Sequence, residues 1–126
     1  MGTAARALAP LTLVVDDEEL VCRMTARLLT EAGFRVAEAH SGAEAVALLA
    51  TLAGNVRLVV SDISMPGMTG LDLTKILADQ WPNLPVLLMS AQGGPDAGYS
   101  GPFLPKPFTA DALLGAVAEL LPTQQH

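Results

Sequence analysis

The sequence is poor in cysteine, in basic charge and in long apolar runs. Cys22 is the single cysteine, so no internal disulfide can form, and with no cluster of His or Cys beside it the residue offers no zinc site. The net charge of −6 argues against general affinity for nucleic acid or anionic membranes, which attract basic proteins. No apolar run approaches the roughly 18 residues of a membrane-spanning helix. We expect a protein of a reducing compartment, without membrane insertion or direct nucleic-acid contact.

The composition suits one domain with a packed aliphatic core. Of 126 residues, 51% are hydrophobic, 16% are charged and only 4% are aromatic. We predict a domain over residues 11–121, with 1–10 as an N-terminal tail and 122–126 as a C-terminal tail. Short apolar runs alternate along it with segments of helical periodicity. Strands are expected over 11–16, 34–39, 57–62, 85–90 and 103–105, and helices over 18–32, from Ser41, over 68–80 and from Thr109.

Local signals mark the ends of two predicted helices. The helix over 18–32 places Val21, Met24 and Leu28 at helical spacing, and Gly33 ends it. Ser41 and the glutamate three residues later form the pattern of a capping box, which opens the next helix.

The alternation of strands and helices predicts an α/β fold, a doubly wound five-stranded parallel sheet. Pro102 and Pro105 flank the fifth strand, and because proline cannot donate a hydrogen bond, this strand should lie at the sheet edge. The flavodoxin-like order 2-1-3-4-5 places it there. In that order, ligands bind where strands one and three end.

Polar residues follow the predicted strands at that position. Asp16 and Asp17 follow the first strand and Asp62 ends the third, so three carboxylates should meet. Like charges resist joint ionisation, and Mg²⁺, which prefers oxygen ligands, relieves the repulsion. Ser90 ends the fourth strand and Lys106 follows the fifth. The set suits a phosphoryl group on Asp62, with the metal and Lys106 neutralising its charge.

Four segments in this order resemble the receiver domain of two-component response regulators, the family of the chemotaxis response regulator. They are VVDDEE (14–19), SDISMPGMTG (61–70), LLMSA (87–91) and PKPF (105–108). The resemblance covers residues 11–121. It implies a cytoplasmic phosphorelay module that accepts a phosphoryl group from a histidine kinase or a histidine phosphotransfer protein. Such a module assists its own phosphorylation and dephosphorylation but has no separate substrate, so it is not an enzyme.

The resemblance also implies a set of metal ligands. Asp62 looks like the phosphoacceptor and a ligand of Mg²⁺. Asp17 would bind the metal directly, Asp16 would hold it through water, and the backbone carbonyl of Ser64 would supply the other protein ligand. Ser64 and Gln92 also occupy the two positions that tune how long the phosphoryl group survives.

Further roles follow the same resemblance. Ser90 resembles the switch hydroxyl that swings to the phosphoryl group, and Lys106 the lysine that stabilises it. Phe103 stands at the aromatic switch position. The Lys106–Pro107 peptide bond is cis in the family.

One segment departs from the family pattern. Only residues 91–105 separate Ser90 from Lys106, and AQGGPDAGYSG (91–101) contains four glycines and a proline, which disfavour a helix. We predict that the fourth family helix is missing or very short. Short, glycine-rich versions resemble receivers at the C-terminus of hybrid sensor histidine kinases. A dimer through helix four, strand five and helix five is therefore not expected, and a histidine-bearing partner would dock near the 18–32 helix and the loop after Lys106.

Two other functions stay open at this point. A degenerate receiver would bind partners without phosphorylation, and metal binding separates it from an active one. A phosphatase of the haloacid dehalogenase type also uses an aspartate nucleophile after a strand, but it needs a second aspartate two residues on, where this chain has Ser64. His40 is interpreted as a loop residue without a metal role.

Overall fold

Strands and helices alternate along the chain as the sequence predicts. The structure is a computed structural model that describes residues 11–52, 54–91, 99 and 101–121. The strands are β1 (Leu11–Val15), β2 (Arg35–Ala39), β3 (Val56–Asp62), β4 (Val86–Ser90) and β5 (Phe103–Pro105). The helices are α2 (Glu19–Glu31), α3 (Gly42–Thr51), α4 (Gly70–Gln80) and α5 (Ala110–Leu120).

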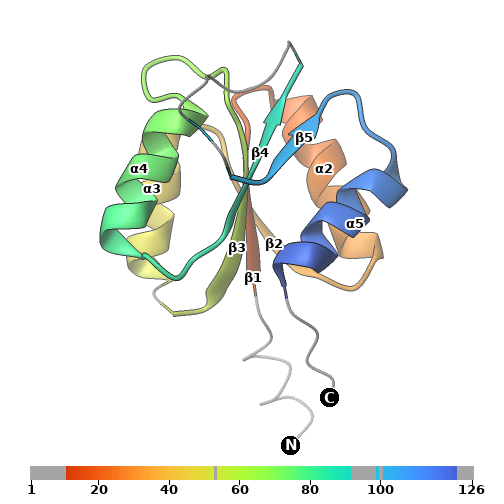
Figure 1. The fold of residues 1–126 in the computed structure, drawn as a ribbon, viewed down its shortest axis with the longest axis horizontal. Coiled ribbons are helices and arrows are strands. Elements are labelled where there is room, and N and C mark those ends of the chain that lie inside the picture. The colour runs from red at the N-terminus through yellow and green to blue at the C-terminus, as the bar shows by residue number, and fades with distance from the viewer. Residues whose placement is uncertain (1–10, 53, 92–98, 100, 122–126) are drawn as a thin grey trace, which may run out of the picture.

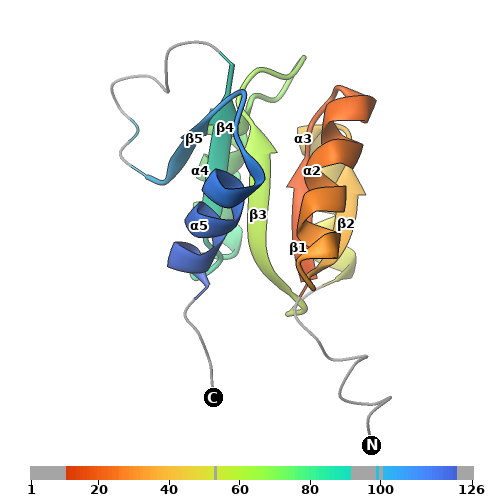
Figure 2. The same cartoon turned by 90° about the vertical axis from the view of Figure 1, so that its right-hand side faces the viewer.

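The five strands form one parallel sheet in the order β2-β1-β3-β4-β5, so the predicted flavodoxin-like order is confirmed. The helices α3 and α4 cover one face of the sheet, and α2 and α5 cover the other (Figure 1). Turned by 90°, the strands spread from β5 at one edge to β2 at the other, with α2 and α5 in front (Figure 2). As the flanking prolines predict, β5 is an edge strand.

The core consists of two aliphatic clusters, one on each face of the sheet. Strand β1 is buried along its whole length, and its successive side chains enter opposite clusters. Complete burial of each leucine or valine contributes about 1.5–3 kcal/mol. The cluster under α3 and α4 includes Leu13, Val15, Leu49, Val59 and Leu73, and the cluster under α2 and α5 includes Val14, Cys22, Leu29, Val60 and Leu113.

The helix ends follow the predicted signals with one difference. Gly33, with φ of 102°, ends α2 in the left-handed conformation that glycine adopts without strain. Ser41 accepts a hydrogen bond from the Glu44 backbone N–H and so caps α3. The Glu44 carboxylate, however, accepts from the backbone N–H of His40 at 2.7 Å and not from that of Ser41. The predicted reciprocal pair is therefore displaced by one residue.

The apolar spacing of α2 does not mark its buried face. Cys22, Thr25, Ala26 and Leu29 are the buried residues, whereas Met24 is 65% exposed. Val21 and Leu28 are partly buried, and Leu28 packs against the cluster under α2 and α5. This helix therefore presents apolar side chains at the surface.

The segment between β4 and β5 holds the predicted departure from the family. Four helices are found among the described residues, which is consistent with a fourth family helix that is missing or very short. Residues 92–98 and 100, on which most of that prediction falls, lie outside the described part of the chain. Over the described ranges, no helix is both long enough and apolar enough to cross a membrane.

Candidate functional site

Three carboxylates meet where β1 and β3 end. Asp16 and Asp17 follow the last residue of β1, and Asp62 is the last residue of β3. Because the two strands are neighbours, oxygen atoms of all three side chains lie within 4.8 Å of one another. Asp16 is fully buried, Asp62 is 6% exposed and Asp17 is exposed. The sequence prediction that these acids converge is thus confirmed in the structure.

A single ammonium group joins two of these acids. Lys106 Nζ lies 3.0 Å from Asp16 Oδ2 and 3.3 Å from Asp62 Oδ1. Its backbone N–H donates to the carbonyl oxygen of Ser90 at 2.8 Å, which ties the loop after β5 to the end of β4. The Lys106–Pro107 peptide bond is cis, as the resemblance implies. Strands at the edge and centre of the sheet therefore supply one charged cluster.

The charges of the cluster shift two pKa values. Burial raises the pKa of Asp62, and the charges of Asp16 and Asp17 add to the effect, although Lys106 opposes it. Burial alone would lower the pKa of Lys106, but its hydrogen bond to Asp16 and the charges of Asp16 and Asp62 raise it. The site therefore favours the charged form of Lys106 and disfavours the charged form of Asp62.

The loop after Asp62 is held by a close backbone approach. Gly70 N–H donates to the carbonyl oxygen of Ile63 at 2.8 Å, and the Thr69 side chain caps α4 in a full capping box with Asp72. A Cβ atom at Gly70 would meet the carbonyl oxygen of Asp62 and come within 2.8 Å of Ile63 Cα. Only glycine fits there, so the start of α4 fixes the backbone that presents Asp62.

The other predicted site residues lie in or after β3, β4 and β5, with one exception. Ser90 ends β4 and is 6% exposed, and Ser64 is exposed in the loop after β3. Phe103 begins β5 and is partly buried. Gln92 lies outside the described residues.

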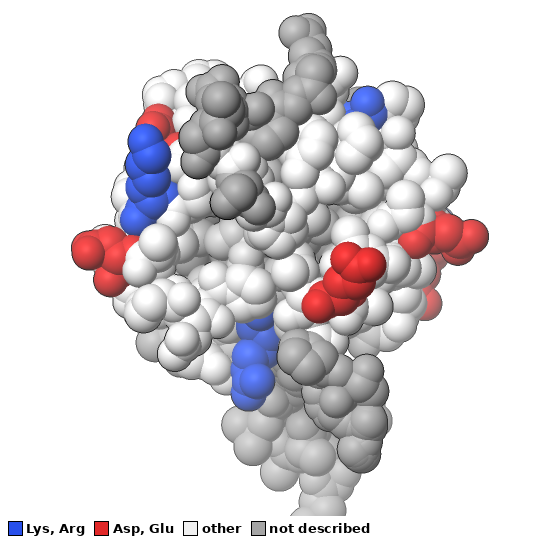
Figure 3. Space-filling model, viewed as in Figure 1, with Lys and Arg blue, Asp and Glu red and all other residues white. Residues whose placement is uncertain are grey.

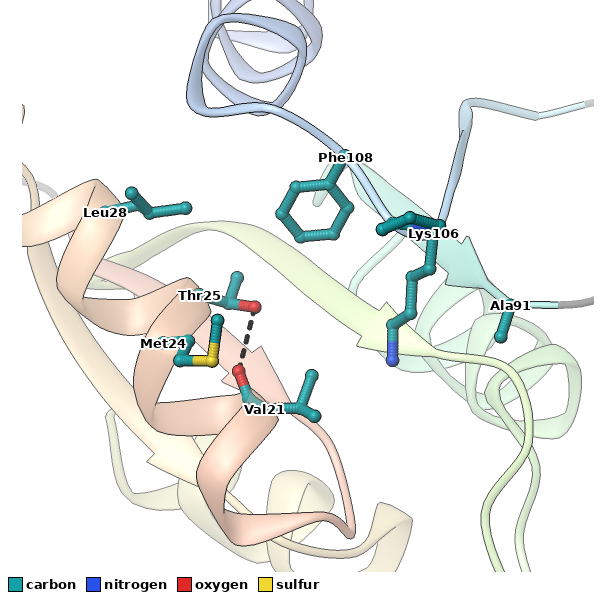
Figure 4. Close-up of a pocket in the computed structure, with 8 residues that line it drawn as sticks. Val21, Met24, Thr25, Leu28, Ala91, Lys106 and Phe108 are labelled. Atoms are coloured by element: carbon teal, nitrogen blue, oxygen red, sulfur yellow. Dashed lines mark hydrogen bonds between the residues drawn. The ribbon is translucent and has the colours of Figure 1, made fainter.

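An apolar groove next to the cluster was not predicted as a feature of the site. It has a volume of about 410 Å³, and Lys106 forms part of its wall. Figure 4 shows Phe108 and Lys106 on the loop after β5 facing Met24, Thr25 and Leu28 of α2. The apolar spacing of α2 was the available signal, but spacing alone does not distinguish a groove wall from a core face.

Comparison with known proteins identifies the family. The model of the response regulator receiver domain matches residues 12–118. The chain belongs to the response regulator receiver domain family, and such domains are signalling modules of two-component systems.

The relatives include hybrid kinases, chemotaxis proteins and transcriptional regulators. The chain is 37% identical over 119 residues to sensor kinase CckA of Brucella abortus, covering 89% of this chain and 12% of the kinase. It is 40% identical over 111 residues to chemotaxis protein CheY of Pseudomonas aeruginosa, covering 80% of this chain and 87% of that one. The chain thus spans about an eighth of the length of CckA.

Solved structures agree on the fold. Vibrio cholerae CheY4 superposes with a TM-score of 0.80 at 28% identity, covering 90% of this chain and 99% of that chain. The receiver domain of the hybrid histidine kinase CckA gives a TM-score of 0.77 at 34% identity, covering 89% and 99%. The resemblance stated from the sequence is confirmed.

Proposed function

We propose that this domain accepts a phosphoryl group on Asp62 from a histidine kinase or a histidine phosphotransfer protein. One observation carries the proposal: Lys106 bridges Asp16 and Asp62 beside Asp17, at the edge where β1 and β3 end. The cluster concentrates negative charge next to one fixed cation. The carboxylates can therefore bind a divalent metal, and the ammonium group can neutralise charge on a phosphoryl group.

The donor set fits Mg²⁺. Three carboxylates within 4.8 Å offer only oxygen ligands, and the exposed Asp17 leaves room for the waters that Mg²⁺ retains. Asp17, Asp62 and the backbone carbonyl of Ser64 would bind the metal directly, and Asp16 would hold it through water. When bound, the metal would neutralise charge on the phosphoryl oxygens.

The residues of the chain then perform a simple displacement. An Asp62 carboxylate oxygen attacks the phosphorus of a phosphohistidine, forming an O–P bond as the P–N bond breaks. The electron pair of that bond returns to the partner's imidazole, which then takes a proton. Lys106 neutralises the charge on the phosphoryl oxygens, and the Ser90 hydroxyl at the end of β4 turns towards them. Phe103, as the aromatic switch, would turn inward on phosphorylation. Ser64 and Gln92 would set the lifetime of the acyl phosphate.

The groove beside Lys106 fits the approach of the histidine-bearing partner. It is lined mainly by apolar side chains of α2 and of the loop after β5, and it is continuous with the site through Lys106 (Figure 4). Leu20 and Met24 are 75% and 65% exposed on α2. An apolar face of this kind, next to the nucleophile, suits a helical partner that buries it while presenting histidine to Asp62.

The charge of the chain supports the expectation that it does not bind nucleic acid. The chain carries a net charge of −6, and on the face shown in Figure 3 the visible Lys and Arg side chains are separate from one another. Such a face does not favour nucleic acid. We further propose a cytoplasmic module, part of a hybrid kinase or phosphorelay, that does not dimerise through helix four, strand five and helix five of the family.

Intact mass after incubation with Mg²⁺ and acetyl phosphate tests the proposal. The chain should gain one phosphoryl group, and the gain should disappear in Asp62→Asn and without Mg²⁺. Asp79→Asn, which removes an exposed carboxylate from α4, is the matched control and should be phosphorylated normally.

Failure of the mass gain would separate the alternatives. If the folded chain binds Mg²⁺ but gains no mass with acetyl phosphate or with a phosphorylated histidine phosphotransfer protein, the phosphoacceptor role is wrong. If it does not bind Mg²⁺ either, it is a degenerate receiver. Steady release of phosphate from small phosphate esters would instead favour the phosphatase.

A further inference from the structure

A second group of side chains that could bind a metal lies between α2 and β2, next to Asp16. Cys22 is on α2, Glu38 is on β2 and His40 directly follows β2. The sulfur, a carboxylate oxygen and an imidazole nitrogen lie within 4.8 Å of one another. The sequence analysis expected no zinc site at Cys22 and no metal role for His40, because Cys22 is far from the other two residues along the chain.

One nitrogen of the His40 imidazole makes no hydrogen bond. His40 Nε2 is buried and makes no hydrogen bond, and it lies 3.7 Å from Glu38 Oε1, beyond hydrogen-bond distance. A buried polar atom without a partner is costly, so a native structure that keeps one usually has a reason for it. The Cys22 thiol lies 3.7 Å from the carbonyl oxygen of Val14 and 3.8 Å from that of Ala39, which are weak hydrogen bonds of a thiol, and it also interacts with the Glu38 side chain.

We propose that Cys22, Glu38 and His40 bind a zinc-type divalent ion. Thiolate, imidazole and carboxylate are the ligands that zinc takes in proteins, and three of them leave a fourth position for water. Ligand bonds of about 2.0–2.3 Å place the donor atoms of a tetrahedral site roughly 3.3–3.8 Å apart. For the oxygen–nitrogen pair the range narrows to about 3.3–3.5 Å. Glu38 Oε1 and His40 Nε2 lie 3.7 Å apart, so a movement of a few tenths of an ångström would bring them to the separation that the ion needs.

This site differs from the aspartate cluster in the metal it selects. Mg²⁺ is a hard ion that avoids sulfur, whereas zinc and cobalt accept thiolate and imidazole. The side chains of Glu38 and His40 are 31% and 40% exposed, so an ion, which is smaller than a thiol reagent, would reach the fully buried Cys22 sulfur from their side. The thiol proton has to leave when the ion binds, so binding weakens as the pH falls.

The ion would join two elements that border the first site. The backbone N–H of Asp16 donates to the carbonyl oxygen of Ala39, between Glu38 and His40. A bound ion would therefore fix α2, with its apolar groove wall, against the end of β2. The inference does not depend on phosphorylation of Asp62, so the two can fail separately.

Titration of the whole chain with Co²⁺, in the presence of excess Mg²⁺ to occupy the aspartates, tests the site. We expect one Co²⁺ per chain, with a thiolate-to-cobalt absorption band that Zn²⁺ abolishes by displacement. Cys22→Ser should lose the band. His40→Ala and Glu38→Gln should each weaken binding at least about tenfold, which is a typical effect of altering a metal's environment.

The controls distinguish a specific metal site from nonspecific metal binding. His126→Ala removes the other histidine of the chain and should leave the titration unchanged. Because Cys22→Ser places a hydroxyl in the core, the partly exposed positions 38 and 40 give the decisive result. A missing sulfur band, or an affinity that His40→Ala does not change, would overturn the proposal.

Discussion

At the scale of single residues, the Lys106 ammonium group balances a carboxylate that has no access to water. Asp16 is fully buried, and Lys106 Nζ is 3.0 Å from it. The raised pKa of Lys106 means that the pair stabilises the fold below the ordinary pKa of lysine and loses this contribution only as the pH rises through the raised value. At neutral pH the contribution is complete.

We therefore predict that Lys106→Met destabilises the domain at neutral pH by about 3 kcal/mol, because it leaves a buried charge without its partner. Urea unfolding measures the loss. Lys75→Met, at the only other lysine and on the exposed surface of α4, should change stability by less than about 0.5 kcal/mol. Equal effects of the two substitutions would show that the ion pair does not hold the site together.

The charge of Asp62 has the opposite effect on stability. Because its pKa is raised, the folded domain binds this proton more tightly than the unfolded chain does, and stability is lost as the pH rises through the raised pKa. We predict that Asp62→Asn raises the free energy of unfolding at neutral pH by about 1 kcal/mol, an ordinary size for one substitution. The difference should vanish below the ordinary pKa of aspartate. Thermal unfolding across the pH range checks this, and a destabilised Asn variant at neutral pH would contradict it.

At the scale of elements, the first residue of α4 restricts the position of the loop that follows β3. A Cβ at Gly70 would meet the backbone of Asp62 and Ile63, whereas a Cβ at Gly115 in α5 would meet nothing within 4 Å. We predict that Gly70→Ala destabilises by about 2 kcal/mol and weakens Mg²⁺ binding, since the loop with Asp62 must shift. Gly115→Ala should stabilise by about 0.5–1 kcal/mol through helix propensity. Mg²⁺ titration and urea unfolding measure both, and unchanged Mg²⁺ affinity in Gly70→Ala would refute the link.

The elements themselves could be read from the sequence because local signals and burial agree. Strand β1 is buried at every position and apolar at all but Thr12, and Gly33, Ser41 and Thr109 each mark a helix end that the structure shows. The edge position of β5 followed from its prolines. The acid cluster followed in turn, because in a parallel sheet the ends of neighbouring strands meet.

Contacts between distant segments could not be read in the same way. The apolar spacing of α2 predicts an amphipathic helix but not its rotation against β1 and β2, so it does not show that Met24 lies at the surface. The same rotation turns Cys22 towards Glu38 and His40. The rotation of a helix against a sheet depends on the sizes of the side chains that pack between them. These side chains come from segments that are far apart in the sequence, so the sequence of one segment does not predict the rotation.

At the scale of the whole molecule, the two sites and the core are parts of one packed unit. Cys22 is the only thiol, is fully buried beside the sheet and has a pKa raised to about 12, chiefly by burial. The thiolate is the reactive form, so a thiol reagent modifies Cys22 only when α2 leaves the sheet. The rate at which Cys22 is modified therefore measures how often α2 separates from the sheet.

We predict that Mg²⁺ slows the modification of Cys22, although the site that we propose for it is the cluster of Asp16, Asp17 and Asp62. A ligand that binds only the folded state lowers the open population by a factor of one plus its concentration over Kd, which is about 100-fold at 100 times Kd. In buffer without other metals, the slowing should be large in the native chain and much smaller in Asp62→Asn, which has lost a ligand. Mass spectrometry of the labelled chain gives both rates. If Mg²⁺ does not change the rate of Cys22 modification, α2 must open while the aspartate cluster is still formed. The domain would then not unfold as a single cooperative unit.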